Sequence, residues 1–555
     1  MKKTNFYRLI ALMLLVTLSF AFTGCGEKTT VNKEDSVPAS SEKVSEAPKI
    51  NYTISPAHTD ATNPANWEIQ WDIIEGDEVV DFYERKDKIS FGLPEEYTVH
   101  EGITTFRGNN YRNDAAFGTV RVNKEEFEIL WTNETSSLGQ WSGVGWTGQP
   151  LIVRWDDETK KVMNLYKDKK NKKGLVEAIC SSLDGHIYFF DLEDGTKTRD
   201  TINVGMTFKG TGTLDPRGYP IMYIGSGIAS GGKDQRMFAI SLIDGKILYE
   251  QSGSDSKALR HWPAFDSSPI IDAETDTLIW PGEMGVLYTL KLNTDYDKEE
   301  GTISIDPEPL AKVRYQTKKS RTGNYWIGFE DSCVIVDRYL YISENGGMFF
   351  CVDLDTMELV WAQDTADDSN STPVFDWGED GNGYIYTAPS LHWTAVGGKG
   401  TVNAYKLDAV TGEILWQIPY DCHTFPSLSG GMQGSPVMGR KGTDLEGVII
   451  YPVAFCPGQS NGKLVALDTK TGETIWEYDM AYYTWSSPVA VYNEKGKSYI
   501  VVGDSAGYLR LIEGSTGEES DSLSLGSNME ASPSVFENTV VIGTRGCRIY
   551  GIKIK

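Results

Sequence analysis

The 555-residue chain lacks the short motifs that mark several common catalytic and metal sites. It has no C-x-x-C, which removes support for zinc ribbons, thioredoxin-like redox sites and haem attachment. H-E-x-x-H and G-x-x-x-x-G-K-[ST] are also missing, so neither a zincin helix nor a nucleotide-binding P-loop is indicated. The six histidines are scattered, and they give no pattern of metal ligands.

Positive charge is scarce in this sequence. Lysine and arginine number 52 against 78 aspartate and glutamate residues, which gives a net charge of −26 and an isoelectric point near 4.7. Because nucleic-acid-binding proteins neutralise phosphates with basic side chains, we expect no nucleic-acid partner. Hydrophobic residues make up 40% of the chain and charged residues 23%, as in a folded globular protein.

Long hydrophobic runs are absent except near the N-terminus. The run from Leu9 to Phe22 follows a basic start and is too short to span a bilayer comfortably. It leads into Thr23-Gly24-Cys25, and the whole segment resembles the lipobox of bacterial lipoproteins. We therefore predict a signal peptide over residues 1–24, lipidation of Cys25, and an exported, extracytoplasmic protein anchored to a membrane by lipid. The alternative is an ordinary secretory signal with a chance cysteine.

Two segments separate Cys25 from the rest of the chain. Residues 25–49 are rich in Ser, Glu, Lys, Thr and Val, lack aromatic residues, and are predicted to form a flexible tether. Residues 50–100 contain Trp67, Trp71 and Tyr83, and this N-terminal extension is either an extra layer of strands or a small cap. Six cysteines follow Cys25, and both a partly paired and a reduced state fit their wide spacing.

Internal repeats are the strongest signal in the sequence. The segment from Ala466 to Trp476 contains Asp468, Thr471 and Gly472 in the order A-x-D-x-x-T-G-x-x-x-W. Related copies contain Lys406, Asp408, Thr411, Gly412 and Trp416, then Cys351, Asp353, Thr356, Met357 and Trp361, with weaker copies around Asp191, Asp244 and Glu513. An aspartate that bonds turn amides and a glycine that accepts positive φ are typical of a hairpin. We predict that the second strand of each hairpin carries a tryptophan that packs against a neighbouring unit.

A Ser-Pro or Thr-Pro pair precedes most units. The pairs are Ser268-Pro269, Thr372-Pro373, Ser435-Pro436, Ser487-Pro488 and Ser532-Pro533, with Gln149-Pro150 as a further copy and Ser332-Cys333 without the proline. Proline is tolerated at the first residue of a strand and at few other places in a sheet, so these pairs mark strand starts. A unit of about 45 residues plus insertions is typical of a four-stranded propeller blade.

The repeats predict an all-β fold, an eight-bladed β-propeller over residues 101–555 with tryptophan-docking repeats. Seven blades are predicted to begin near Gly148, Phe208, Ser267, Asp331, Ser371, Gly434 and Ser486. The last unit, from Ser532, has only three strands, so we predict that the N-terminal segment Phe127–Trp131 closes it and removes exposed sheet edges. The polar cluster Arg107–Asp114 is expected to fix this closure, with a ligand role as the alternative.

The repeat pattern resembles the tryptophan-docking repeat of propellers similar to pyrroloquinoline quinone (PQQ) dehydrogenases. The same repeat occurs in the propeller lipoprotein of the outer-membrane barrel-assembly machine. The resemblance covers about Glu101 to Lys555, and its superfamily includes enzymes, scaffolds and binding modules. For a PQQ dehydrogenase, it would imply a quinone at the funnel, a Ca²⁺ ion, a catalytic aspartate and often a vicinal disulfide. The chain has no adjacent cysteines, and Ca²⁺ ligands do not match residue by residue. We therefore predict no cofactor, with PQQ and Ca²⁺ as the alternative.

Two acidic segments are similar to cation-binding loops. Asn293–Glu299 carries Lys298 where an EF-hand needs glycine, so we predict a solvated acidic insertion. Asp376–Gly383 is predicted to be a hairpin turn between two strands, with a cation site as the alternative.

Aromatic residues gather in the connections that precede the first strand of several blades. In a propeller, these connections and the loop between the second and third strands lie on one face, around the central channel. The candidate ligand-face residues are Trp141, Trp146, His261, Trp262, Tyr325, Trp326, His392, Trp393, Tyr483 and Trp485. They either plug the channel or form stacking surfaces for an apolar segment of a partner or a sugar ring.

These patterns predict a non-catalytic binding or scaffold module that engages an envelope protein or glycan through the aromatic face. Two alternatives remain: a PQQ-dependent quinoprotein-like oxidoreductase, and a carbohydrate-binding or carbohydrate-sensing surface lipoprotein.

Overall fold

The structure, a computed structural model, describes residues 52–425 and 427–555, which lie in one compact unit, Asn51–Lys555. The predicted signal peptide, the lipidation site Cys25 and the predicted tether lie outside the described residues. In the described part of the chain, no helix is both long enough and apolar enough to cross a bilayer.

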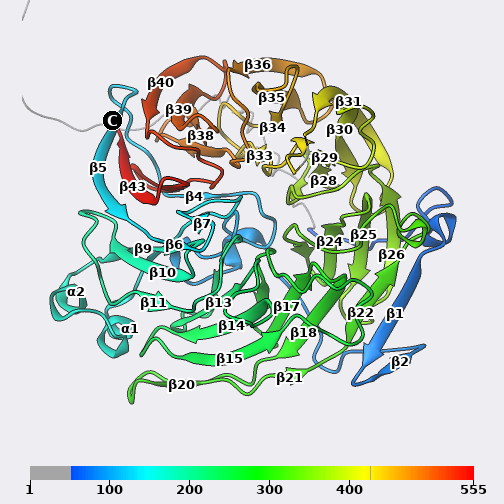
Figure 1. Ribbon diagram of the computed structural model, residues 1–555, viewed down its shortest axis with the longest axis horizontal. Coiled ribbons are helices and arrows are strands. Elements are labelled where there is room, and N and C mark those ends of the chain that lie inside the picture. Colours follow the sequence, from blue (N-terminus) through cyan, green and yellow to red (C-terminus); the bar gives the residue numbers. More distant parts are fainter. Residues whose placement is uncertain (1–51, 426) are drawn as a thin grey trace, which may run out of the picture. The chain divides into compact units, whose positions relative to one another are not determined.

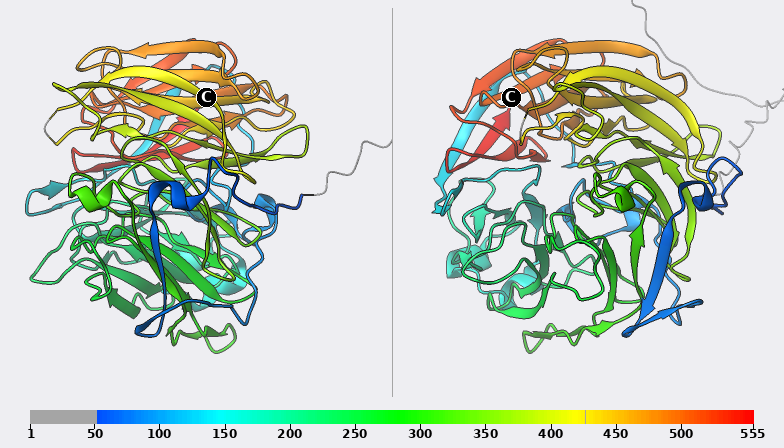
Figure 2. Two further views of the ribbon diagram at one scale, coloured as in Figure 1. Left: turned by 90° about the vertical axis from the view of Figure 1, so that its right-hand side faces the viewer. Right: turned by 45° about the vertical axis from the view of Figure 1, so that its right-hand side comes forward.

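The described chain forms a β-propeller, in which antiparallel sheets are arranged around a ring (Figures 1 and 2). Seven blades are each built from strands of one continuous stretch of chain. The first blade contains β8 (Leu151–Arg154), β9 (Val176–Ser181), β10 (His186–Asp191) and β11 (Ile202–Asn203), and the second contains β12 (Thr213–Leu214), β13 (Ile221–Gly225), β14 (Arg236–Ser241) and β15 (Ile247–Ser252). The third blade contains β16 (Ile270–Asp272), β17 (Thr277–Gly282), β18 (Val286–Lys291) and β22 (Lys312–Gln316), and the fourth contains β23 (Val334–Val336), β24 (Tyr339–Ser343), β25 (Met348–Asp353) and β26 (Leu359–Asp364). The fifth blade contains β27 (Val374–Trp377), β28 (Gly383–Thr387), β30 (Lys399–Asp408) and β31 (Ile414–His423). The sixth contains β33 (Val437–Met438), β34 (Val448–Ala454), β35 (Gly462–Asp468) and β36 (Thr474–Met480). The seventh contains β37 (Val489–Tyr492), β38 (Ser498–Gly503), β39 (Tyr508–Glu513) and β40 (Glu519–Ser524).

A composite sheet closes the ring by joining the two ends of the propeller. Its strands β41 (Ser534–Phe536), β42 (Thr539–Thr544) and β43 (Arg548–Ile554) come from the C-terminus. The outer strand β5 (Phe127–Glu134) runs antiparallel to β43, with Trp131 opposite Gly551, and confirms the predicted closing strand. The predicted count of eight blades is thereby corrected to seven single-stretch blades, and what the sequence predicted as an eighth is this composite sheet.

The N-terminal extension adds strands to the third blade. Within it, β1 (Gln70–Glu75) pairs with β22 and with β2 (Glu78–Val80), between the short helices η1 (Pro64–Trp67) and η2 (Pro94–Glu96). Figure 1 shows β1 and β2 beyond β22, at the periphery of that sheet. The extension therefore contributes two outer strands to an existing sheet.

Short elements interrupt or flank the blades. They are β3 (Glu101–Ile103), β4 (Ala116–Phe117), β6 (Ser137–Leu138), β7 (Trp141–Ser142), α1 (Asp157–Val162), α2 (Lys167–Asn171), β19 (Asp295–Asp297), β20 (Thr302–Ser304), β21 (Glu308–Pro309), η3 (Ser320–Thr322), β29 (Ser390–Leu391) and β32 (Gly430–Gly431). The predicted acidic insertion forms the β19–β20 hairpin, where Asp295 and Asp297 are exposed. The predicted hairpin turn links β27 to β28, and the Gly378 amide donates to the Asn382 carbonyl there.

The repeat tryptophans dock on the next unit, as predicted. The indole donors and their backbone acceptors are Trp131 and Leu192 (2.9 Å), Trp361 and Ala409 (3.3 Å), Trp416 and Thr469 (3.2 Å), and Trp476 and Gly514 (2.8 Å). Each ring also covers a hairpin glycine. A Cβ on Gly412 would lie 2.6 Å from the Trp361 ring, so this glycine is required by the docked indole as well as by its φ of +73°.

The Ser-Pro and Thr-Pro pairs join adjacent blades through hydrogen bonds. The amide of the Ser or Thr in each copy donates to the hydroxyl of its counterpart in the next blade, and this includes Ser332, which precedes Cys333 instead of proline. The bonds measure 2.9–3.0 Å in the pairs Ser268–Ser332, Ser332–Thr372, Thr372–Ser435, Ser435–Ser487 and Ser487–Ser532. The Gln149 amide donates to the Thr211 hydroxyl, the Ser268 hydroxyl donates to the Thr211 carbonyl, and the Ser532 amide donates to the Gly148 carbonyl. We call Gln149, Thr211, Ser268, Ser332, Thr372, Ser435, Ser487 and Ser532 the hydroxyl ring.

Two buried arginines tie the N-terminal segment to the first strands of several blades. The Arg107 guanidinium donates to the carbonyls of Pro488 (2.6 Å) and Pro436 (2.8 Å). The Arg112 guanidinium donates to the carbonyls of Cys333 (2.9 Å) and Ser268 (3.3 Å). Burial lowers the pKa of Arg107 to about 10.

These contacts extend the expected role of the polar cluster. Arg107 and Arg112 are 1% and 0% exposed, and they reach the third, fourth, sixth and seventh blades rather than only the closing pair. Both residues have a φ of +57°, which non-glycine residues rarely adopt. The surrounding bonds therefore hold this segment in an otherwise unfavourable conformation.

Replacing Arg112 tests this tie. Arg112→Met should lower the free energy of unfolding by about 2–4 kcal/mol, because the carbonyls of Ser268 and Cys333 would stay buried without these donors. Denaturant unfolding followed by tryptophan fluorescence measures the change. Arg121→Met is the control, since the Arg121 side chain is 81% exposed and its loss should cost less than about 0.5 kcal/mol. Equal losses in the two variants would contradict the assigned role.

A pair of glycine variants separates indole docking from backbone strain. Gly412 and Gly442 have nearly the same φ, +73° and +75°, but no atom lies within 4 Å of a Cβ built on Gly442. Gly442→Ala should lower the free energy of unfolding by about 1 kcal/mol, through the strain of a positive φ alone. Gly412→Ala should cost about 1–3 kcal/mol more, because the Trp361 ring must move. Denaturant midpoints measure both, and equal costs would show that the docked indole is not confined by this glycine.

Candidate functional site

The connections that lead into the first strands converge on a cavity of about 630 Å³, which we call the mouth cavity. Its wall includes residues from the connections before β8, β12, β16, β23, β27, β33 and β37. The loop between β28 and β30 contributes His392 and Ala395. The cavity therefore lies on the face that the sequence predicted for a ligand.

Much of the cavity wall comes from one position of the repeat. Residues two places before members of the hydroxyl ring line it, namely Thr147, Lys209, Asp266, Glu330, Asn370, Gln433 and Trp485. Because alternate residues of an extended chain point to the same side, the bonds of the hydroxyl ring also fix the direction of these side chains. Of these seven residues, only Trp485 is among the aromatic candidates predicted from the sequence, although the register of the Ser-Pro pairs points to all of them.

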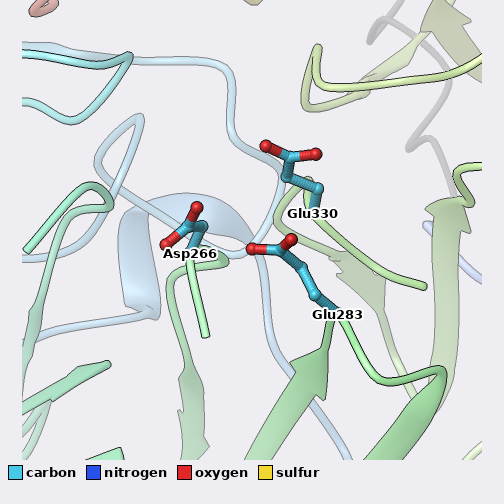
Figure 3. Close-up of side chains that lie close together, drawn as sticks. All are labelled: Asp266, Glu283 and Glu330. Carbon is cyan, nitrogen blue, oxygen red and sulfur yellow. The ribbon is translucent and has the colours of Figure 1, made fainter. Parts of the chain in front are cut away.

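Three carboxylates lie close together beside the mouth cavity (Figure 3). Asp266 and Glu330 precede β16 and β23, whereas Glu283 lies in the turn between β17 and β18. Carboxylate oxygens of the three lie within 4.8 Å of one another. Asp266 Oδ1 and Glu283 Oε1 are buried without a hydrogen-bond partner among the described residues.

Lys209 supplies a cation to this carboxylate cluster. Its Nζ lies 2.5 Å from Asp266 Oδ2 and 4.6 Å from the centre of the Trp146 ring. Burial opposes the charge on Lys209, but Asp266, Glu283 and Glu330 outweigh it and raise the pKa of the ammonium. The cluster thus already contains one positive group, which belongs to the chain itself.

Acidic groups outnumber basic groups around the mouth cavity, and burial favours the neutral form of several of them. Burial raises the pKa of Glu283 and Asp368 well above the usual range, and neighbouring carboxylates add to both shifts. Burial also raises the pKa of Glu330, although Lys209 opposes that shift. A bound cation or strong hydrogen-bond donor would relieve this repulsion and stabilise the ionised carboxylates.

The first aromatic cluster consists of Tyr325, Trp326, His392 and Trp393. The Trp326 ring centre lies 4.9 Å from that of Trp393 and 5.2 Å from that of His392, and Tyr325 packs on Trp393 at 5.4 Å. The Trp393 indole donates to the Asn345 carbonyl, which anchors it. Trp326 is 47% exposed and, like His392, lines the mouth cavity.

The second aromatic cluster consists of Trp141, Trp146, Tyr483 and Trp485. Trp146 lies 5.9 Å from Trp141 and 6.3 Å from Trp485, and Tyr483 packs on Trp485 at 5.5 Å. Trp146 and Trp485 line the mouth cavity, but Trp485 is only 6% exposed. The Trp485 ring therefore packs against Trp146 and Tyr483 as well as lining the mouth cavity.

The remaining two candidates do not line the mouth cavity. His261 is exposed, and Trp262 is 37% exposed with its indole donating to Glu283 Oε2 at 2.8 Å. Trp262 therefore positions the Glu283 carboxylate without lining the mouth cavity itself. Four of the ten predicted residues, Trp146, Trp326, His392 and Trp485, line the cavity, and the other six support it or lie apart. A ligand role for all ten stays a prediction.

One further motif has the spacing of a hydrolase nucleophile. Gly458-Gln459-Ser460-Asn461-Gly462 reads G-x-S-x-G, but it lies in the connection between β34 and β35 and not on a strand-to-helix turn. Ser460 is exposed, and no histidine hydrogen-bonds to it among the described residues. This segment does not have the geometry of an activated serine.

Two solved structures with TM-scores above 0.5 show the fold. Quinohemoprotein alcohol dehydrogenase from Comamonas testosteroni has a TM-score of 0.52 and 13% identity, over 82% of this chain and 80% of that one. Quinohemoprotein alcohol dehydrogenase ADHIIG from Pseudomonas putida HK5 has a TM-score of 0.51 and 13% identity over the same shares. BamB from Moraxella catarrhalis has a TM-score of 0.32 and 13% identity, over 77% of this chain and 98% of that one.

Comparison of the sequence itself identifies the family. A search of the curated proteins finds no match to the chain. The model of the PQQ_2 family, described as "Outer membrane protein assembly factor BamB", matches residues 271–484 and 404–553. These matches together span more than half of the chain and include the copies with the clearest hairpin tryptophans. The chain belongs to the PQQ_2 family.

Proposed function

We propose that the protein is a non-catalytic binding module of the cell envelope, and that its mouth cavity holds a basic, partly apolar segment of a partner protein. The observation that carries the proposal is the combination of tryptophan faces with an excess of carboxylates in one cavity. The placement outside the cytoplasm and the lipid anchor at Cys25 belong to the same proposal, and they rest on the N-terminal sequence.

The charges of the cavity favour a basic group. Four carboxyl groups, those of Asp266, Glu283, Glu330 and Asp368, outnumber the basic groups Lys209 and Arg260 that act on this cluster in the described part of the chain. Because the cavity is partly desolvated, a lysine or arginine side chain of a partner would gain more from these carboxylates than it would at an open surface. The chain's net charge of −26 would also steer a basic partner toward it.

The aromatic rings suit the same kind of partner. Lys209 lies over Trp146, and the Arg260 guanidinium lies 4.9 Å from the centre of the Trp326 ring, so these rings already contact cations of the chain itself. Trp326 is also exposed enough to receive an apolar side chain beside that cation. The description of the PQQ_2 family as an assembly factor supports a protein partner over a small-molecule substrate.

Paired variants test the mouth cavity as the binding site. The full-length protein would capture partners from an envelope extract, and each partner identified would be purified and titrated. Trp326→Ala and Glu330→Gln should each weaken binding at least about ten-fold, or about 1.4 kcal/mol, because they remove a stacking face and a carboxylate. Phe82→Ala and Glu84→Gln are the controls, since both side chains are exposed on the N-terminal extension.

The outcomes of this experiment separate a protein partner from a glycan. Partner binding that is equally strong in Trp326→Ala, Glu330→Gln and the controls would contradict the proposal. Glycan-array binding that is lost in Trp326→Ala or Trp262→Ala, without a protein partner, would assign the site to carbohydrate. The exposed faces of these two tryptophans are the observation that favours that alternative.

A quinoprotein oxidoreductase is the second alternative, and the site fits its cofactors poorly. Ca²⁺ takes about six to eight oxygen ligands, whereas the cluster offers three carboxylates of which one already binds Lys209. The cysteines of the described chain are all free, and no two are adjacent in the sequence. We therefore derive no reaction step through a quinone at this site.

Cofactor retention tests the quinoprotein alternative directly. After incubation with PQQ and CaCl₂ and then desalting, the full-length protein should keep no quinone absorbance, because Lys209 occupies the carboxylate cluster. Absorption spectroscopy measures the result. Retention of one PQQ per chain in the wild type and in the control Glu84→Gln, with loss in Glu283→Gln, would overturn the proposal in favour of the oxidoreductase.

A further inference from the structure

Two cysteines that are far apart in the sequence lie on adjacent chain segments next to the mouth cavity. Cys422 is in β31 of the fifth blade, and Cys456 follows β34 of the sixth blade. The His423 amide donates to the Phe455 carbonyl at 3.0 Å, so the neighbours of the two cysteines are directly bonded. This bond holds the two segments side by side, and a disulfide requires Cα atoms no more than about 7 Å apart.

The two thiols share one buried environment. Cys422 is 2% exposed and Cys456 is 5% exposed, and both belong to the apolar cluster between the fifth and sixth blades. Each thiol is the largest influence on the other, and together they raise the pKa of Cys422 and lower the pKa of Cys456. Cys456 is therefore the better thiolate of the two.

No other pair of cysteines in the described residues has this arrangement. Cys180, Cys333 and Cys351 belong to three different apolar clusters. Cys547 is partly exposed, and its sulfur contacts the Ser136 carbonyl. The shared apolar cluster and the hydrogen bond between their neighbours thus single out Cys422 and Cys456.

We propose that Cys422 and Cys456 form a disulfide when the protein meets an oxidant, and that the bond braces the wall of the mouth cavity. The oxidant is a small exchangeable disulfide, R–S–S–R. The Cys456 thiolate attacks one of its sulfurs and releases R–S⁻, which leaves a mixed disulfide. Cys422 loses its proton, and its thiolate attacks the Cys456 sulfur and releases the second R–S⁻. The protein gives up two protons and two electrons, and the small disulfide becomes two R–SH.

A Cys422–Cys456 bond would lie beside the wall of the mouth cavity. Thr424, Phe425 and Leu428 line the mouth cavity, and they follow Cys422 directly along the chain. Phe425 packs against Phe455, the residue before Cys456, at 5.2 Å between ring centres. A Cys422–Cys456 bond would fasten this part of the wall to the sixth blade and restrict its motion.

Peptide mapping tests the proposal without reference to any ligand. The full chain is refolded in a buffer of oxidised and reduced glutathione, its free thiols are blocked with iodoacetamide under denaturing conditions, and it is digested with trypsin. Cleavage at Lys and Arg gives residues 407–440 with Cys422 as their single cysteine, and residues 442–463 with Cys456 as theirs. We expect these two peptides to be joined, and to separate after reduction with a gain of two hydrogens.

Single-cysteine variants give the controls. Cys456→Ser should leave Cys422 alkylated, whereas Cys180→Ser should leave the joined peptides unchanged, because Cys180 lies in another cluster. Reduction should lower the Tm of the wild type by a few degrees and leave that of Cys456→Ser unaltered. Complete alkylation of Cys422 and Cys456 in the refolded wild type, or a bond from either to another cysteine, would overturn the proposal.

Discussion

A ring of blades leaves the inner edge of each first strand without a neighbouring strand, and the polar groups on that edge must still be satisfied. The N-terminal segment meets this requirement. Its strands β3 and β4 pair with β8 and β41, and its buried arginines, Arg107 and Arg112, donate to carbonyls of four further blades. A segment that precedes every blade in the sequence is therefore an internal part of the propeller, and the conformation of its two arginines is kept by the blades that they join.

The first strands and the connections that lead into them also determine the geometry of the mouth cavity. The hydroxyl ring sets the register of the chain as it enters each blade, so a residue two positions earlier points into the cavity. This allows the wall to combine a lysine, carboxylates, amides and a tryptophan without any change of fold. The cost is electrostatic, because buried carboxylates such as Glu283 and Glu330 repel each other and are held together by the surrounding blades.

Prediction succeeded where the relevant residues are close in sequence or repeat in register. The hairpin spacing gave the strand pairs and the docked indoles, and the incomplete last unit gave the closing strand β5. It failed for the carboxylate cluster, because Asp266, Glu283 and Glu330 belong to three separate connections whose meeting depends on how two blades pack. The aromatic candidates were selected by residue type alone, so some of them, such as Trp262, turned out to support the site from outside.

The sequence by itself determined the β-propeller repeat, the docking of each tryptophan on the next hairpin, and the need for an N-terminal strand at the last sheet. These features follow from turn chemistry and side-chain alternation, which act over a few residues and repeat along the chain. Only the tertiary structure decided that Arg107 and Arg112 bridge the blades, that Lys209 lies among carboxylates, and that Cys422 and Cys456 share one apolar cluster. Each of these contacts joins segments that are far apart in the sequence. No local sequence pattern predicts such a contact, because the packing of whole blades determines which segments meet.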